Sequence, residues 1–150
     1  HPDQPVKEIA SLLGPQAKQA AIDLKVTFLG KKDLQVMMDP GAMHTCVFNL
    51  TTNALDAFET TAAPEQPRQV HLFVQQKDNT VVYQVQDNGM GMNKTIQQTV
   101  FTDFITTKGT RGTGFGLMTT KKIVEEHKGR IGFTTQEGKG SKFWIQLPLS

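Results

Sequence analysis

One stretch, residues 39–58, constrains the fold of this 150-residue chain more than any other. Its apolar residues recur at steps of three and four, the spacing that places them on one face of a helix. Asp39 suits the cap of the first turn, and Pro40 suits the first helical position, where no N–H is needed. The stretch therefore predicts a helix that packs one face against a core. The apolar face consists of Met43, Cys46, Val47, Leu50, Ala54 and Phe58.

A polar column runs beside this apolar face. Asn49, Asn53 and Asp56 stand at i, i+4 and i+7, so they share one side of the helix. Polar side chains on the flank of a buried face indicate the wall of a pocket. The other interpretation is an ordinary solvated helix edge, and the column alone does not decide between the two.

Charge and cysteine content exclude several classes of protein. The formal net charge is +2 and the basic residues are scattered, which argues against a nucleic-acid partner. The single cysteine, Cys46, excludes an internal disulfide framework and is expected to fill space in the core. The length suits one domain, residues 1–150, and the chain contains neither a signal peptide nor an apolar run that would span a bilayer. A piece of a membrane-anchored parent would look the same.

The segments on either side of this helix also show hydrophobic patterns that predict secondary structure. Residues 5–22 predict a helix kinked or broken at Pro15, and residues 24–29 and 34–38 predict a pair of strands. Residues 60–67 read as a connection. Alternating apolar residues then predict two β-hairpins, and a short helix is expected over residues 95–100. The inward residues of the hairpins are Val70, Leu72, Val74, Val81, Tyr83 and Val85 in the first and Phe143, Ile145 and Leu147 in the second.

The alternation of the first hairpin places Asp87 on the apolar side of its strand. A carboxylate in that position needs a partner. The following sequence, D-N-G-M-G-M over residues 87–92, contains Asn-Gly, which by itself is also common in hairpin turns. The buried carboxylate is what favours a ligand.

A second glycine-rich segment, G-T-R-G-T-G-F-G-L, covers residues 109–117. It opens a helix that is expected to stop at Lys128 and Gly129. Glycine-rich backbone at a helix N-terminus suits phosphate. The segment lacks the lysine and hydroxyl of a P-loop, and it lacks the preceding strand of a dinucleotide-binding motif.

Four segments in this order resemble the ATP-binding catalytic domain of sensor histidine kinases, a branch of the superfamily that includes type II topoisomerases and mismatch-repair ATPases. The wording N-A-L-D-A and T-T-K is most similar to the nitrogen-regulation type of these kinases. The resemblance covers nearly the whole chain. The corresponding boxes are Asn49–Ala57 (N box), Asp87–Met92 (G1 box), Phe101–Phe104 (F box) and Gly112–Leu117 (G2 box).

The resemblance implies a fold and a ligand. The fold is a two-layer α/β sandwich, the Bergerat fold, with a mixed, largely antiparallel sheet and helices on one face. The ligand is ATP with Mg²⁺, where Asp87 accepts from the adenine amino group, and Asn53 and Asn49 offer oxygens to the metal. Lys108 and Arg111 either add charge at the phosphates or are solvated loop residues. The other implied nucleotide-binding residues are Asp56, Gly89, Gly91, Met92, Phe101, Thr107, Gly112, Thr113, Gly114, Phe115, Gly116 and Leu117. The segment from Asn93 to Arg111 is the expected lid.

Asn49 separates a kinase from an ATPase. The hydrolysing relatives carry a glutamate there that activates water, whereas an amide takes no proton at neutral pH. Efficient hydrolysis is therefore not expected. Transfer to a neutral histidine needs positioning more than a strong base.

The chain departs from the family's usual sequence at three positions, and it lacks the family's phospho-accepting histidine. Asp103, Phe115 and Lys128 replace a usual proline, leucine and glycine. His44, His71 and His127 do not match the phospho-accepting histidine, and each is expected to be structural or solvated.

The partners implied are the dimerisation domain of the same kinase, which carries that histidine, and a response regulator. The fragment is expected to be monomeric, in a homodimeric parent, and cytoplasmic. A hydrolysing ATPase, a serine-directed kinase and a nucleotide-binding docking module stay open as alternatives.

Overall fold

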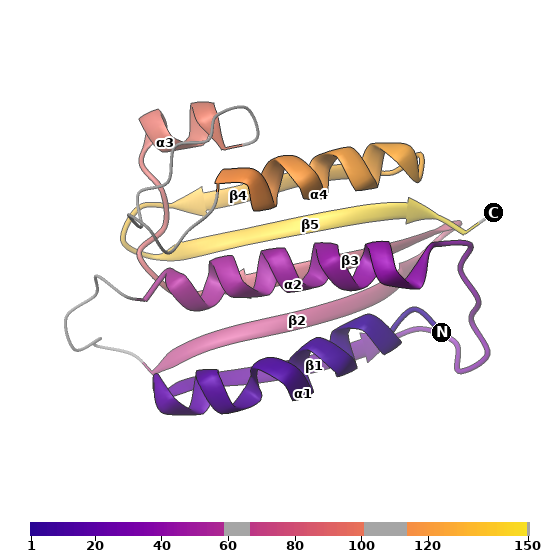
Figure 1. The fold of residues 1–150 in the computed structure, drawn as a ribbon, viewed down its shortest axis with the longest axis horizontal. Coiled ribbons are helices and arrows are strands. Elements are labelled where there is room, and N and C mark those ends of the chain that lie inside the picture. The colour runs from indigo at the N-terminus through magenta and orange to yellow at the C-terminus, as the bar shows by residue number, and fades with distance from the viewer. Residues whose placement is uncertain (59–66, 101–113, 150) are drawn as a thin grey trace.

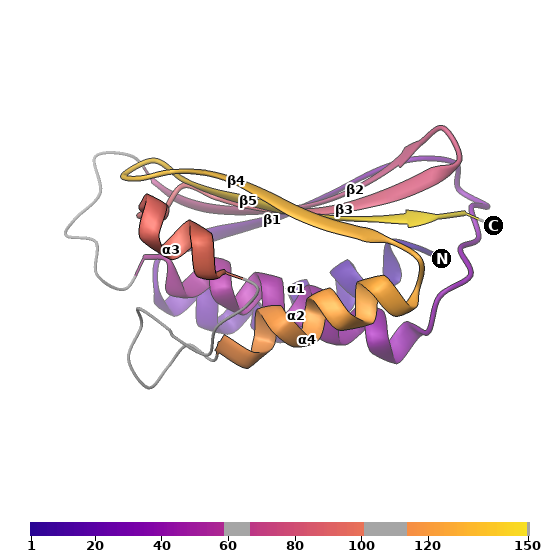
Figure 2. The ribbon, with the colours of Figure 1, turned by 90° about the horizontal axis from the view of Figure 1, so that it is seen from above.

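The computed structural model describes residues 1–58, 67–100 and 114–149, with residues 114 and 115 described by their backbone only. Within these ranges the chain forms two layers, a sheet and a layer of helices on one of its faces (Figures 1 and 2). The elements are α1 (Gln4–Gln19), β1 (Ile22–Leu29), α2 (Pro40–Asp56), β2 (Arg68–Lys77), β3 (Thr80–Asp87), α3 (Lys94–Thr99), α4 (Gly114–Glu126), β4 (Arg130–Gln136) and β5 (Gly140–Pro148).

The sheet has the strand order β1-β2-β3-β5-β4. β1 and β2 are parallel, and the other three neighbouring pairs are antiparallel. Helices α1, α2 and α4 lie next to one another along the same face (Figure 2). The predicted mixed, largely antiparallel sheet with helices on one face is confirmed.

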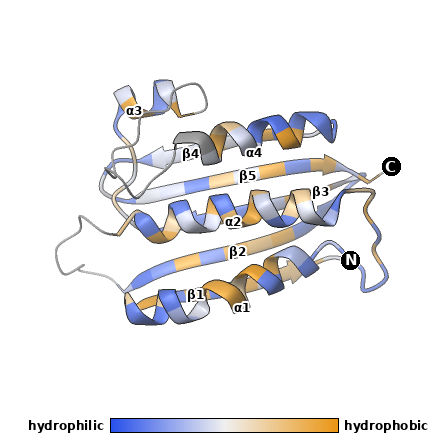
Figure 3. Ribbon diagram, viewed as in Figure 1, coloured by the Kyte–Doolittle hydropathy of each residue, from blue (hydrophilic) through white to orange (hydrophobic). Residues whose placement is uncertain are grey.

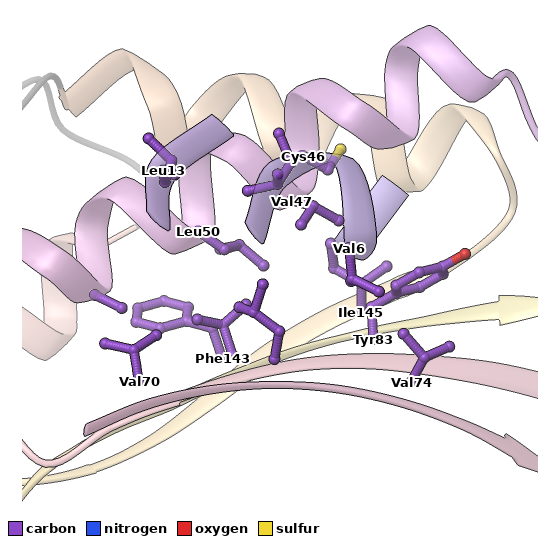
Figure 4. Close-up of a cluster of buried hydrophobic side chains, with 14 of the residues drawn as sticks. Val6, Leu13, Cys46, Val47, Leu50, Val70, Val74, Tyr83, Phe143 and Ile145 are labelled. Carbon is purple, nitrogen blue, oxygen red and sulfur yellow. The ribbon is translucent and has the colours of Figure 1, made fainter. Parts of the chain in front are cut away.

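The core lies between the two layers, where the predicted inward residues meet (Figure 4). All six of the first hairpin and all three of the second are at most 3% exposed. Blue, white and orange segments follow one another along β5, as expected for a strand with one buried face (Figure 3). Cys46 is fully buried, and this burial raises the pKa of its thiol to about 12. Its predicted role as core filler is confirmed.

Helix α2 begins as predicted. The Asp39 carboxylate accepts hydrogen bonds from the backbone N–H groups of Gly41 (2.9 Å) and Ala42 (3.2 Å), and Pro40 is the first helical residue. The short helix α3 is capped in the same way, because Asn93 Oδ1 accepts from the N–H of Ile96 (2.9 Å). Both helix starts are therefore fixed by local sequence.

The first helix differs from the prediction in two respects. α1 is continuous through Pro15 and ends at Gln19, so a break at Pro15 is wrong, and Ile22 opens β1. A proline removes one bond to the carbonyl four residues earlier, here that of Ser11. Because Ser11 is exposed, water can satisfy this carbonyl, and the buried face continues on both sides of Pro15.

The predicted strand over residues 34–38 is also wrong. The segment is irregular, and β1 pairs with β2 instead. The alternation that suggested a strand is real, since Leu34, Val36 and Met38 pack toward the core while Met37 is 84% exposed. An alternating pattern reports which side chains are buried, and it does not show that the backbone has a strand partner.

The end of α4 leads to a prediction about stability. Lys128 has φ 59°, a left-handed conformation that glycine adopts without strain, and the Gly129 N–H closes the helix on the carbonyl of Val124 (2.9 Å). Lys128→Gly should therefore stabilise the fold by about 0.5–1 kcal/mol, after allowing for the extra freedom of glycine in the unfolded chain.

Urea unfolding measures this difference. Lys122→Gly is the matched control, because Lys122 is exposed inside α4, where glycine should cost about 1 kcal/mol. If both substitutions changed the free energy of unfolding in the same direction, the backbone of Lys128 would not be strained.

Candidate nucleotide-binding site

Asp87 is the last residue of β3 and points into the molecule, as its place in the alternation predicted. Asp87 is 7% exposed, and its Oδ1 accepts a hydrogen bond from the Gly89 N–H (2.9 Å). A carboxylate withdrawn from water in this way is held by donors, and it offers a strong acceptor to a ligand.

The turn after Asp87 is held between two other elements. On one side the Met90 N–H donates to the carbonyl of Ala57, at the end of α2 (3.1 Å). On the other side the Met90 carbonyl accepts from the N–H of Gly138, in the β4–β5 turn (2.7 Å). The path of the turn is therefore fixed by α2 and by the edge of the sheet.

Both glycines of this turn are required by close approach. A Cβ on Gly89 would lie 2.8 Å from the Ala57 carbonyl oxygen. Gly91 has φ 67°, and a Cβ there would collide with the carbonyl of Gln136. The glycine pattern that predicted close backbone approach thus has a direct cause in packing.

Two hydroxyl groups lie beside Asp87 that the motif analysis missed. Asp87 pairs with Ser141 across β3 and β5, and Ser141 pairs with Thr135 across β5 and β4, so the three side chains share one face. Ser141 Oγ and Thr135 Oγ1 are 2.9 Å apart, and Thr135 Oγ1 also accepts from the Met92 N–H (3.0 Å). The alternation of Phe143, Ile145 and Leu147 extends to Ser141 and was the available signal.

The polar column of α2 faces the start of α4. The Asn49 side-chain nitrogen donates to the Gly116 carbonyl (3.2 Å) and to Thr120 Oγ1 (3.3 Å). Asn53 and Asp56 follow on the same column and are half-buried. Asn49 therefore joins this side of α2 to α4, and the assignment of the column to a nucleotide pocket stays a prediction.

The structure places part of the predicted nucleotide-binding set. Gly114 and Phe115 lie in the first turn of α4, so the glycine-rich segment opens a helix as predicted. Met92 and Leu117 pack against the core. The remaining positions lie outside the described residues: Phe101, Thr107, Lys108, Arg111, Gly112 and Thr113, with most of the expected lid.

The side-chain oxygens of α2 suit a magnesium ion that is held mainly by the phosphates of a nucleotide. Among the described residues, no group of three His, Cys, Asp or Glu side chains is placed to hold a metal ion. Asn49 donates through its side-chain nitrogen to α4, and both Asn49 and Asn53, one turn later on α2, carry an amide oxygen. Mg²⁺ prefers hard oxygen ligands and often takes only one or two from the protein.

The three internal histidines make contacts that agree with structural roles. His71 Nε2 lies 2.7 Å from Thr27 Oγ1, and His44 Nε2 lies 3.9 Å from a carboxylate oxygen of Glu8. His127 accepts from the Asp39 N–H (3.2 Å) and lies 2.8 Å from the Ile123 carbonyl, which joins the end of α4 to the start of α2.

Comparison with protein families matches residues 38–150 to the family described as histidine kinase-, DNA gyrase B-, and HSP90-like ATPase. The chain therefore belongs to this family, and its relatives identify it as a catalytic domain of the sensor histidine kinase kind. None of the comparisons bears on the nitrogen-regulation subtype, which stays a prediction.

Two curated relatives illustrate the similarity. The probable C4-dicarboxylate sensor kinase of Halalkalibacterium halodurans is 32% identical over 131 residues, which are 84% of this chain and 24% of that protein. Sporulation kinase E of Bacillus subtilis is 30% identical over 153 residues, covering 99% of this chain and 19% of that protein. The chain thus spans about a fifth to a quarter of the length of these two relatives.

Solved structures agree on the fold. The catalytic domain of histidine kinase ThkA superposes with a TM-score of 0.80 at 25% identity, covering 98% of this chain and 91% of that one. Full-length ShkA in complex with AMPPNP superposes with a TM-score of 0.80 at 22% identity, covering 100% of this chain and 30% of that one. Within the described ranges, no helix is both long and apolar enough to cross a membrane.

Proposed function

We propose that this chain binds Mg-ATP and donates the γ-phosphate to a histidine on a separate dimerisation domain of the same kinase, which then passes it to a response regulator. The observation that carries the proposal is the buried Asp87 carboxylate, set at the end of β3 on the same buried face as Val81, Tyr83 and Val85. The proposal includes two further points. Residues 1–150 form one catalytic domain, and this domain lies in the cytoplasm, where ATP is present.

Three parts of the described site have a role in this proposal. Asp87 accepts from the adenine amino group, a donor that guanine lacks at that position. Asn53, with Asn49 one turn earlier, presents amide oxygens toward Mg²⁺ at the phosphates. The free N–H groups of the first turn of α4 face the phosphate negative charge.

Transfer needs no strong base from this chain. The neutral imidazole of the acceptor histidine forms a nitrogen–phosphorus bond while the bond from the γ-phosphorus to the departing ADP oxygen breaks. Asn49 lies where a hydrolysing ATPase needs a base, and its amide nitrogen is bonded to α4. The site thus supports positioning of the nucleotide over activation of water.

Incubation with γ-labelled ATP tests the proposal. The chain alone should bind Mg-ATP and stay unlabelled, because none of its histidines lies in the acceptor motif. Adding the dimerisation domain of the parent kinase in trans should produce label on that domain, and the label should be lost in acid, as expected for phosphohistidine.

The alternatives predict other outcomes. Acid-resistant label would indicate a serine-directed kinase, and rapid release of phosphate without a partner would indicate a hydrolysing ATPase. Binding of Mg-ATP with no transfer to the added domain would indicate a docking module. Any of these three results would overturn the proposed transfer.

A further inference from the structure

A closed triangle of hydrogen bonds joins α2 to the first two turns of α4. The Thr120 hydroxyl donates to the Gly116 carbonyl at 2.7 Å. The side-chain nitrogen of Asn49 donates to that same carbonyl at 3.2 Å and to the Thr120 hydroxyl at 3.3 Å. The side-chain nitrogen of one amide and the hydroxyl of one threonine therefore bond to each other and share one backbone oxygen as acceptor.

Packing alone does not explain a threonine at position 120. The residue is fully buried and lies one turn before the buried Val124 on the same helix. Valine has the same branched shape and no hydroxyl to satisfy, so it would fill the space without a hydrogen-bonding requirement. The hydroxyl is satisfied here by its own helix and by Asn49, and this gives the polar group a role in joining the two helices.

The triangle lies at the part of the site that is proposed to bind the phosphates and the metal ion. Gly116 belongs to the first turn of α4, whose N–H groups have no partners within the helix. Asn49 lies one turn before Asn53 on α2. The triangle therefore fixes the start of α4 relative to the two amides proposed to face the metal ion.

We propose that Thr120 is a positioning residue of the nucleotide site, which acts through Gly116 and Asn49 to hold the first turn of α4 against the phosphates. This inference rests on the proposed function. It concerns the phosphate side of the site only, since the contacts described for Asp87 and the turn after it are with the sheet and with the end of α2. Loss of the Thr120 hydroxyl should thus affect phosphate-dependent binding and leave recognition of the base unchanged.

Four variants test the role. Thr120→Val keeps the shape and removes the hydroxyl, whereas Thr120→Ser keeps the hydroxyl and removes a methyl group. Thr119→Val is the matched control, because Thr119 is the exposed neighbour on the same helix. Thr120→Ala, compared with Thr120→Ser, repeats the test without a branched apolar side chain if Thr120→Val does not fold.

Affinity for Mg-ATP and for adenosine is measured by NMR titration of each variant. Thr120→Val should weaken Mg-ATP binding by about two- to tenfold, the effect of one hydrogen bond, with adenosine affinity unchanged. Thr120→Ser and Thr119→Val should both bind Mg-ATP like the wild type. In the nucleotide-free chain, amide hydrogen exchange of residues 116–120 should become faster in Thr120→Val and not in Thr119→Val.

The contrary outcomes are distinct. Equal losses for Mg-ATP and adenosine would show that Thr120 is merely structural, and an unchanged Mg-ATP affinity would show that the hydroxyl does not position the site. Either result overturns the role of Thr120 and leaves the proposed function standing. A wild-type chain that binds neither ligand would overturn both.

Discussion

Replacing Asp87 by asparagine should weaken ATP binding by about 5- to 150-fold, which corresponds to the ~1–3 kcal/mol of a buried polar group left without its partner. The variant keeps an oxygen that can accept from the Gly89 N–H, so the turn should persist. Its new NH₂ group, however, would meet the adenine amino group donor to donor. Nearly the whole effect should therefore appear in nucleotide affinity and little of it in stability.

Calorimetric titration with Mg-ATP measures the affinity, and urea unfolding measures the stability of the same samples. Asp78→Asn is the matched control, since Asp78 is exposed in the β2–β3 turn and its φ of 54° is one that asparagine also tolerates. It should change neither quantity. If Asp87→Asn binds ATP as tightly as the wild type, Asp87 does not contact the base.

Gly91→Ala should destabilise the fold by about 3 kcal/mol, the largest stability effect expected at the site. The left-handed conformation costs about 1–2 kcal/mol for any residue with a Cβ. The collision with the Gln136 carbonyl adds an overpacking cost of about 1–3 kcal/mol, because backbone at the end of β4 cannot rotate away as a side chain can. Met92, whose N–H is bonded to Thr135, would be displaced with it.

Gly138→Ala separates the two contributions. Gly138 has φ 80°, yet a Cβ there would meet no atom within 4 Å. Its replacement should cost about 1 kcal/mol, the conformational part alone. Thermal or urea unfolding of both variants gives the comparison, and equal losses would mean that the approach of Gly91 to Gln136 is not a constraint.

Local sequence patterns were sufficient to predict much of the fold and the burial of Asp87. The helical stripe and cap of α2 and the alternation of both hairpins were readable because each depends on neighbours within a few residues. The inward direction of Asp87 followed from the same alternation. These features needed no knowledge of which elements lie next to each other.

Apart from the break expected at Pro15, the errors and omissions arose where pairing between distant segments decides the structure. Residues 34–38 carry an alternating pattern, but whether β1 pairs with them or with β2 depends on contacts more than 40 positions away. Ser141 was missed for the same reason, because its place beside Asp87 depends on β5 lying next to β3. The bonds from Asn49 to Gly116 and Thr120 likewise join elements that are distant in sequence.

The parallel pairing of β1 with β2 has a consequence for how a ligand enters. The chain leaves β1, passes through α2 and returns to the sheet at β2, so α2 is the crossover between two strands that are paired over eight residues. Lifting α2 from the sheet would pull on both strands and expose its buried face. α3 precedes α4 in the chain, and neither connects two paired parallel strands. We therefore expect α2 to stay fixed as nucleotides exchange, with entry and departure taking place along the side of the site that α3 and the start of α4 border.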